Sequence, residues 1–206
     1  MYSNCYYHVI ARGNNKNEIF HVPQDYLTYL ELVRKYKYEH PFELYHYALM
    51  PNHIHLLVKI LSPSEFSKYM KQVGLSYYLY YNRIYTWTGH LWQGRFRSQY
   101  VGNDEYFLQC GKYIELNPLR ANIVKSPELY NFSSYAFYAK GHFDDLLTED
   151  PFYKEISPDK AIRAKLYRQM VCGDEVLRSY GDAAWGRREH LYEFRRRNRI
   201  RTNLLK

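Results

Sequence analysis

Two histidines separated by one residue, His53 and His55, are the first residues whose spacing could support chemistry. On a strand, successive side chains point to opposite faces, so both imidazoles would share one face while Ile54 points to the other. Two neutral imidazoles on a rigid strand could bind one divalent metal ion. The simpler interpretation is a strand with two partly exposed histidines, because so short a motif often arises by chance.

A tyrosine and an asparagine four residues apart, Tyr113 and Asn117, form the second candidate pair. Residues at this spacing are neighbours on one face of a helix. Asn117 would add an oxygen ligand to the two histidine nitrogens, a mixed set that suits Mn²⁺, with abundant Mg²⁺ as the alternative. Tyr113 could then attack a phosphate and hold the product covalently. Alternatively, Tyr113 is a packing aromatic among 25 tyrosines, and Asn117 is a helix C-cap.

The elements that must position these residues follow the order strand, helix, strand, strand, helix, strand. We expect strands over residues 6–12, 42–50, 53–60 and 96–101, and helices over residues 24–40 and from about 62 to 84. This order is typical of the ferredoxin-like βαββαβ fold, an α+β architecture with an antiparallel sheet and helices on one face.

Helix ends are also predicted from local residue types. Ser62 with Glu65 three residues later has the spacing of a capping box. A helix from about residue 103 carries Tyr113 and should end or kink at Pro118. A later helix over residues 157–171 should close near Gly173.

Composition predicts a soluble nucleic-acid-binding protein with two parts. We expect a catalytic domain over residues 1–140 and a helical, basic extension over residues 141–206. The net charge of +8 and the pI near 9.2 favour a polyanionic partner, and residues 185–206 hold eight basic and two acidic residues. Three separated cysteines, no signal sequence and no long apolar run predict a cytoplasmic protein without a membrane span.

Four segments in order resemble the REP-associated tyrosine transposases, a branch of the single-tyrosine HUH nucleases. They are YHVIARGN (7–14), YALMPNHIHLL (47–57), LWQGRF (91–96) and KYIELNPLRA (112–121), and the resemblance covers roughly residues 6–138. It implies a ferredoxin-like core, a metal bound by His53 and His55 with Asn117, and Tyr113 as the nucleophile. Insertion-sequence relatives usually carry Gln as the third ligand, so Asn117 favours the REP-associated branch.

The resemblance also implies a reaction and a partner. The protein would nick single-stranded DNA beside a hairpin, leaving a 5′-phosphotyrosine and a free 3′-OH, and would act at the nucleoid as a monomer, with a homodimer possible. Basic, polar and aromatic residues could grip phosphates or stack on unpaired bases. The candidates are Arg12, Asn14, Lys16, Trp92, Arg95, Arg97 and Arg120, with Arg195, Arg196 and Arg197 in the basic tail. Alternatively, some of these are solvated charges or core aromatics.

The alternative function is a non-catalytic binding module for single-stranded nucleic acid. RNA-binding domains use the same strand order and stack bases on aromatic residues of the sheet. Such a module would not need two histidines, a tyrosine and an asparagine together. A zinc hydrolase is less consistent with the sequence, because there is no H-E-x-x-H helix.

Overall fold

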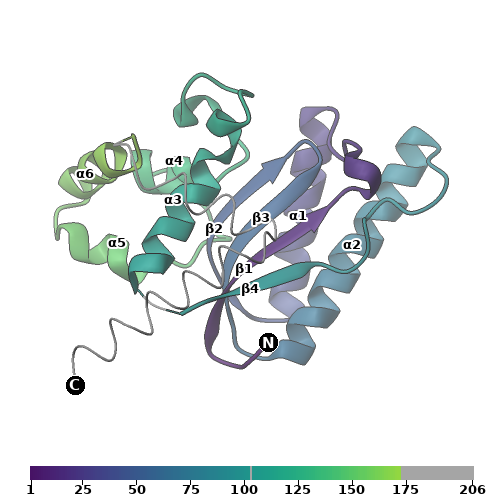
Figure 1. Ribbon diagram of the computed structural model, residues 1–206, viewed down its shortest axis with the longest axis horizontal. Helices are drawn as coiled ribbons and strands as arrows, with labels where there is room; N and C mark the ends of the chain where they lie inside the picture. The colour runs from purple at the N-terminus through teal and green to yellow at the C-terminus, as the bar shows by residue number, and fades with distance from the viewer. Residues whose placement is uncertain (103, 173–206) are drawn as a thin grey trace, which may run out of the picture. The chain divides into compact units, whose positions relative to one another are not determined.

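The computed structural model describes residues 1–102 and 104–172, and Met1–Cys172 forms one compact unit. Its sheet contains β1 (Cys5–Arg12), β2 (Glu43–Met50), β3 (His53–Ile60) and β4 (Arg97–Val101). The strand order is β2-β3-β1-β4, and all neighbouring strands are antiparallel. Together with α1 (Pro23–Glu39) and α2 (Pro63–Tyr85), this confirms the predicted ferredoxin-like α+β fold (Figure 1).

Further helices follow the sheet in sequence. These are α3 (Asp104–Arg120), α4 (Tyr135–Lys140), α5 (Pro151–Ile156) and α6 (Lys160–Cys172), with 3-10 turns η1 (Asn14–Lys16) and η2 (Pro127–Leu129). The compact unit therefore continues past the expected boundary at residue 140: the amide of Thr148 donates to the carbonyl of Leu44 on β2 at 2.7 Å. The predicted basic extension beyond residue 172 lies outside the described residues.

The alternation of side chains gives the sheet two chemically different faces. Val9 of β1 and Ile54 of β3 are fully buried in the main core with residues of α1 and α2. His8 and His55, which follow the opposite alternation, face the side that α3 covers (Figure 1). The apolar face thus anchors the sheet, while the other face can present polar groups.

Two predicted helix starts need correction, the first only in its capping bonds and the second in its position. Ser62 is the N-cap of α2, as expected, but its side chain makes no cap bond, and the Glu65 carboxylate binds Lys68 and His40, each at 2.7 Å, instead of completing a capping box. The last predicted helix begins at Lys160, where the carboxylate of Asp159 accepts from the amide of Ile162 at 2.8 Å. At α6 the carboxylate of Asp159 therefore takes the capping role that the sequence pattern had assigned to Ser157.

Helix α3 also continues through Pro118 to Arg120 rather than ending at Asn117. A proline removes one backbone donor and normally leaves the carbonyl four residues earlier without its partner. Here the side-chain amide of Asn117 donates to the carbonyls of Tyr113 at 2.8 Å and Ile114 at 3.4 Å. The side chain replaces the missing donor, so the helix can extend one further turn.

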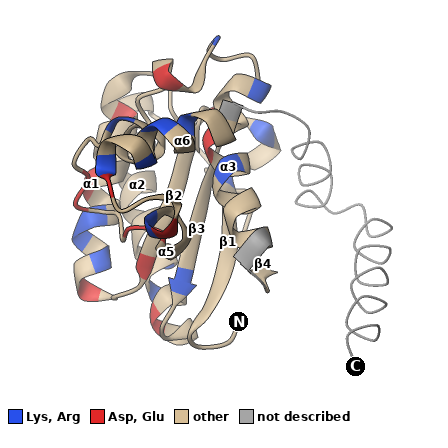
Figure 2. Cartoon of the chain, turned by 90° about the vertical axis from the view of Figure 1, so that its left-hand side faces the viewer, with Lys and Arg blue, Asp and Glu red and all other residues tan. Residues whose placement is uncertain are grey.

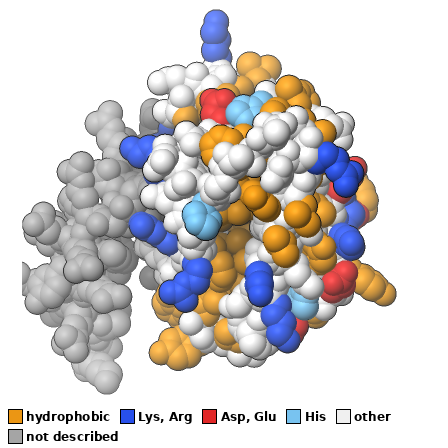
Figure 3. Space-filling model, turned by 90° about the vertical axis from the view of Figure 1, so that its right-hand side faces the viewer, with side chains coloured by type: hydrophobic (Ala, Val, Ile, Leu, Met, Phe, Trp, Pro, Cys, Tyr) orange, Lys and Arg blue, Asp and Glu red, His pale blue; other side chains and the backbone are white. Residues whose placement is uncertain are grey.

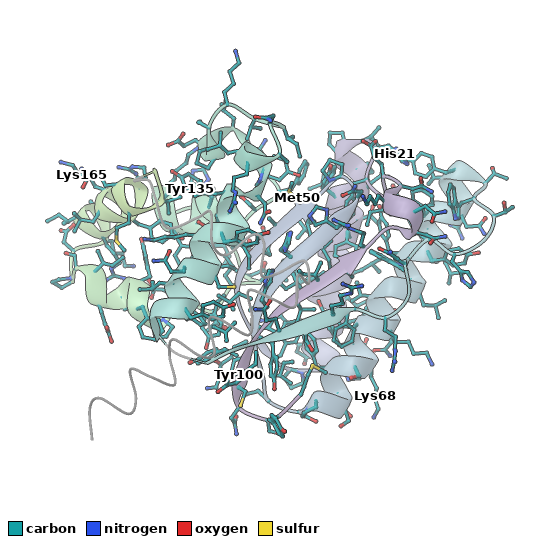
Figure 4. The ribbon with its side chains drawn as sticks, in the orientation of Figure 1. His21, Met50, Lys68, Tyr100, Tyr135 and Lys165 are labelled. Carbon is teal, nitrogen blue, oxygen red and sulfur yellow. The ribbon has the colours of Figure 1, made fainter. Side chains whose placement is uncertain are left out.

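One end of the sheet gathers the polar residues of interest. In Figure 4, Met50 marks the end of β2 just before the turn into β3, and Tyr100 lies at the opposite end. Arg12, the last residue of β1, pairs with His53, the first of β3. Among the described residues, no helix is long and apolar enough to cross a bilayer.

Candidate active site

His53 and His55 lie on one face of β3, with ring centroids 4.8 Å apart. His55 is completely buried and His53 is partly buried. Between them, Ile54 is buried on the other face of the sheet. The strand therefore brings two imidazoles together without exposing the apolar residue that separates them.

Each histidine is oriented through its Nδ1 atom. His53 Nδ1 lies 2.5 Å from Asn52 Oδ1, and because a carbonyl oxygen only accepts, the Nε2 atom of His53 carries the lone pair. His55 Nδ1 lies 2.8 Å from His8 Nε2, and within the described chain the buried Nε2 of His55 has no hydrogen-bond partner. A metal-binding histidine typically has this arrangement, with one ring nitrogen held by a neighbour and the other left as ligand.

The electrostatic surroundings keep these rings neutral. Burial and the nearby charge of Arg12 lower the pKa of His53 to about 4. Burial, followed by His53, lowers the pKa of His8 to about 3, and the same causes hold the pKa of His55 well below its usual range. Neutral imidazole is the form that can donate a lone pair, so the pair is ready to bind a cation at neutral pH.

Tyr113 on α3 lies next to the histidines. Its ring centroid is 5.9 Å from that of His55 and 6.0 Å from that of His8, and its side chain is 3% exposed. The guanidinium of Arg120, the last residue of α3, lies 5.2 Å from the centroid of the Tyr113 ring. Burial and Arg97 lower the pKa of Arg12, whereas Tyr113 raises it, so Arg12 is also within electrostatic reach of the phenol.

Asn117 is the residue that the sequence predicts as the third, oxygen ligand beside the two histidine nitrogens. It lies one helical turn after Tyr113, its amide nitrogen donates to the helix, and among the described residues its oxygen accepts no hydrogen bond. The described part of the chain holds no group of three His, Cys, Asp or Glu that could bind a metal, so an amide oxygen would have to supply the third ligand. This donor set and the buried Nε2 of His55 fit Mn²⁺ or Mg²⁺.

A buried polar cluster fixes the far side of α3. His46 of β2 lies between two carboxylates, with Nδ1 2.9 Å from Glu115 Oε1 and Nε2 3.2 Å from Asp150 Oδ2. Glu115 also accepts from Ser134 and from Tyr167 of α6, both at 2.7 Å. Although burial opposes it, the two carboxylates raise the pKa of His46 to about 9, so the ring is charged and balances part of the buried negative charge.

Six of the predicted DNA-binding residues fall into two groups, one at the end of β1 and one in a neighbouring groove. Arg12 is the last residue of β1, and Asn14 and Lys16 lie in η1. The side-chain amide of Asn52, the residue before β3, donates to the carbonyl of Lys16 at 3.0 Å and so holds η1 beside the histidine strand. Trp92, Arg95 and Arg97 line a separate groove, where the Trp92 indole donates to the carbonyl of Gly74 at 3.0 Å and packs partly against the core.

Two remaining groups complete the basic set. Arg120 is exposed beside Tyr113, and Figure 2 shows Lys and Arg on both α3 and α6. Arg195, Arg196 and Arg197 lie outside the described residues, and their role stays a prediction.

The sequence reasoning assigned no role to His8, Asn52 or Glu115, although each supports a candidate residue. Asn52 directly precedes the histidine pair, and a polar residue at that place could have been recognised as a possible partner of the first imidazole. His8 contacts His55 across 47 residues, so its role depends on the register between β1 and β3. A carboxylate such as Glu115 is usually expected in solvent, and its role as a buried acceptor becomes visible only from its contacts in the folded protein.

Comparisons with known proteins identify the family of this chain and structures with a similar fold. Residues 1–117 match the profile of a family described as IS200-like transposases. A solved structure of a REP-associated tyrosine transposase bound to a REP hairpin aligns with a TM-score of 0.56 at 18% identity, covering 72% of this chain and 88% of that one. A candidate transposase from Deinococcus radiodurans R1 aligns with a TM-score of 0.40 at 16% identity, covering 60% and 88%. No curated protein sequence matches the chain.

Proposed function

Because this chain belongs to the IS200-like transposase family, we propose that it cuts and rejoins single-stranded DNA at hairpins through a covalent bond to Tyr113. The observation that carries the proposal is the placement of Tyr113 beside two neutral histidines, with 5.9 Å between the ring centroids of Tyr113 and His55. A purely structural tyrosine would not require a neighbouring imidazole whose Nε2 is buried without a hydrogen bond among the described residues.

His53, His55 and Asn117 would hold a divalent cation, Mn²⁺ or Mg²⁺. When bound, the cation supplies positive charge that polarises the phosphate to be cut. His8 and Asn52 orient the two imidazoles, which keeps their ligand atoms in place before DNA arrives. Metal dependence is therefore part of the proposal.

The covalent step would exchange one phosphate ester for another. Tyr113 Oη forms a bond to phosphorus and loses its proton, while the bond between phosphorus and the 3′ oxygen breaks and that oxygen gains a proton. Arg12 and Arg120 place positive charge near the phenol and could stabilise the negative charge that develops there. The products are a 5′-phosphotyrosine and a free 3′-OH.

The same residues would allow the reverse reaction with a different DNA end. A phenolate is a better leaving group than an alkoxide, because a tyrosine side chain has a pKa of about 10. A 3′-OH that enters the site can therefore displace Tyr113 and join the strands. This property suits strand transfer, as transposition requires, rather than degradation.

The proposed partner is hairpin DNA with unpaired flanks, and the proposed place of action is the nucleoid. The net charge of +8 supports a polyanionic partner. The structurally similar REP-associated transposase is bound to a REP hairpin, which makes hairpins the first substrates to test. We propose a monomer, because the described residues of one chain bring the tyrosine and both histidines together.

The test is a search for a covalent adduct with the full chain. Hairpin oligonucleotides with unpaired flanks of varied sequence are labelled at either end and incubated with Mn²⁺ or Mg²⁺, then run on a denaturing gel. We expect the 3′-labelled fragment to migrate with the protein and the 5′-labelled fragment to be released. Tyr113→Phe, His55→Ala or a chelator should abolish the adduct.

Matched variants separate the site from general effects. Tyr100→Phe changes an exposed tyrosine at the opposite end of the sheet, and His142→Ala changes an exposed histidine, so both should retain the adduct. An adduct that survives Tyr113→Phe would overturn the assignment of the nucleophile. Hairpin binding without any adduct across the flank series would favour the non-catalytic binding module.

A further inference from the structure

A groove lies apart from the histidine–tyrosine site, between α2, the loop of residues 86–96 and the start of β4. Its volume is about 1430 Å³, larger than the roughly 300–1,000 Å³ of most small-molecule pockets. Figure 3 looks onto the side of the molecule that carries α2 and shows hydrophobic side chains around a hollow, with Lys and Arg nearby. The size favours a stretch of polymer over a small molecule.

The charges that line the groove are all positive. Lys71, Arg95 and Arg97 contribute cations, and no Asp or Glu is among the described residues of its lining. None of these three cations forms an ion pair within the described part of the chain, in contrast to Lys68 one turn earlier on α2, which binds Glu65 at 2.7 Å. Cations without an ion-pair partner among the described residues, contributed by α2, the loop and β4, are suited to binding phosphates.

Apolar and aromatic side chains form the rest of the groove. Leu75 is 53% exposed, and Tyr78 and Phe96 are partly buried, so each presents some apolar surface to the opening. Flat apolar groups next to cations are the usual platform for unpaired bases, which bring a ring face and a phosphate together. A second copy of the chain fits less well, because it would bring the same cations against each other.

The groove is connected to the candidate active site through the end of β1. The amide of Gln93 donates to the carbonyl of Arg12, and the amide of Asn14 donates to the carbonyl of Leu91, each at 2.8 Å. Arg97 pairs with Ile10 and is close enough to Arg12 to lower its pKa. A DNA strand that leaves the groove past Arg97 would therefore meet Arg12 and then Tyr113.

We propose that this groove binds an unpaired segment of the DNA strand that Tyr113 cuts. The inference rests on the proposed function for the identity of that strand, but the binding site itself is defined by the cations and aromatic residues of the groove. The proposal gives Lys71 and Tyr78 of α2 a contact with DNA on the side of the sheet opposite to α3, which carries Tyr113.

The test compares two double variants in a Tyr113→Phe background, so that binding is measured without cleavage. Lys71→Gln with Arg95→Gln removes two groove cations, and Lys35→Gln with Arg83→Gln removes two exposed cations outside it. Fluorescence anisotropy measures binding to a hairpin with a flank of about eight thymidines, within the range of single-strand site sizes. The same hairpin without a flank is the reference.

We expect the groove variant to bind the flanked hairpin about five- to tenfold more weakly and to lower its salt slope by about 1.4, or 0.7 for each lost contact. The groove variant should bind the flankless hairpin as tightly as the parent does. The control variant should bind both hairpins as tightly as the parent does. Equal effects on both hairpins, or none, would overturn the proposal. So would unchanged DNA binding with altered sedimentation, which would identify the groove as an interface between copies.

A second measurement does not depend on substitutions. A flank that contains 4-thiothymidine should crosslink, on irradiation, to peptides from residues 71–78 or 90–98, and crosslinks confined to other peptides would contradict the groove. These outcomes are distinct from failure of the proposed function. Failure of the unsubstituted protein to form a covalent adduct would refute Tyr113 chemistry, whereas the binding and crosslinking results are obtained in the Tyr113→Phe background and do not depend on that chemistry.

Discussion

Alanine substitutions at two helical glycines should have opposite effects on stability. Gly111 lies in α3 beside His46, and a Cβ atom there would be 2.7 Å from His46 Nε2 and 2.9 Å from Cδ2 and Cε1. Gly74 lies in α2, where a Cβ atom would first meet the Trp92 indole nitrogen at 3.5 Å, an ordinary contact. Alanine favours a helix over glycine by about 1 kcal/mol, so local preference alone would predict a gain at both sites.

The His46 ring cannot easily move away from a new methyl group. It is buried, bonded to Glu115 and Asp150, and stacked on Tyr138 with centroids 4.5 Å apart. Overpacking of this kind costs roughly 1–3 kcal/mol, and loss of a buried charge partner costs about 3–5 kcal/mol. After the helix gain of about 1 kcal/mol is subtracted, overpacking alone would reduce the free energy of unfolding by up to about 2 kcal/mol, and loss of a charge partner of His46 would reduce it by about 2–4 kcal/mol.

Urea denaturation followed by circular dichroism measures both variants. Gly74→Ala should raise the free energy of unfolding by about 0.5–1 kcal/mol, and Gly111→Ala should lower it, with Tm moving by roughly 2–4 °C for each kcal/mol. If Gly111→Ala stabilises the protein as much as Gly74→Ala, the close packing of His46 against α3 is refuted.

Three further predictions concern the polar groups around the site. His8→Ala should weaken Mn²⁺ binding, measured by calorimetry, about 10- to 100-fold, because His55 loses the group that orients it. His142→Ala is the control, and equal Mn²⁺ affinities of the two variants would contradict this role. Tyr167→Phe should reduce the free energy of unfolding by about 1–3 kcal/mol, since Glu115 loses a buried donor, whereas the 94% exposed Tyr38 should tolerate Phe. The pKa of His46 is raised to about 9, above its usual 6.5, so its stabilisation is complete below pH 6.5 and is lost as the pH rises through 9. Denaturation curves measured between pH 6.5 and 9 should show the free energy of unfolding falling in the parent and falling less in His46→Gln. An equal dependence of the free energy of unfolding on pH in both proteins would contradict a charged His46 ring.

The elements of the fold could be predicted because their signals are local. The alternation around His53-Ile54-His55 indicates a strand with two different faces, and the four-residue spacing of Tyr113 and Asn117 indicates one face of a helix. The observed structure has both arrangements. The helix ends were less predictable, because Glu65 has competing partners in Lys68 and His40 that no local pattern reveals.

The supporting contacts depend on residues that are distant in sequence. His8 reaches His55 only when β1 and β3 pair in the observed register, which places Ile10 opposite His55. Glu115 becomes a buried acceptor only when Tyr167 of α6 reaches α3 across 52 residues. Neither contact follows from a spacing within one element, so the sequence alone did not indicate the residues that hold the candidate groups in place.

The buried carboxylate of Glu115 sets a minimum length for the working enzyme. A protein shortened to residue 140 would keep the four strands, both histidines and Tyr113, but would lose Asp150 and Tyr167. His46 on β2 and Glu115 on α3, two residues after the candidate nucleophile Tyr113, would then have fewer partners. The smallest fragment with the proposed activity should therefore extend through α6, because a fragment that ends before α6 would keep Tyr113 but lose contacts that fix α3 behind it.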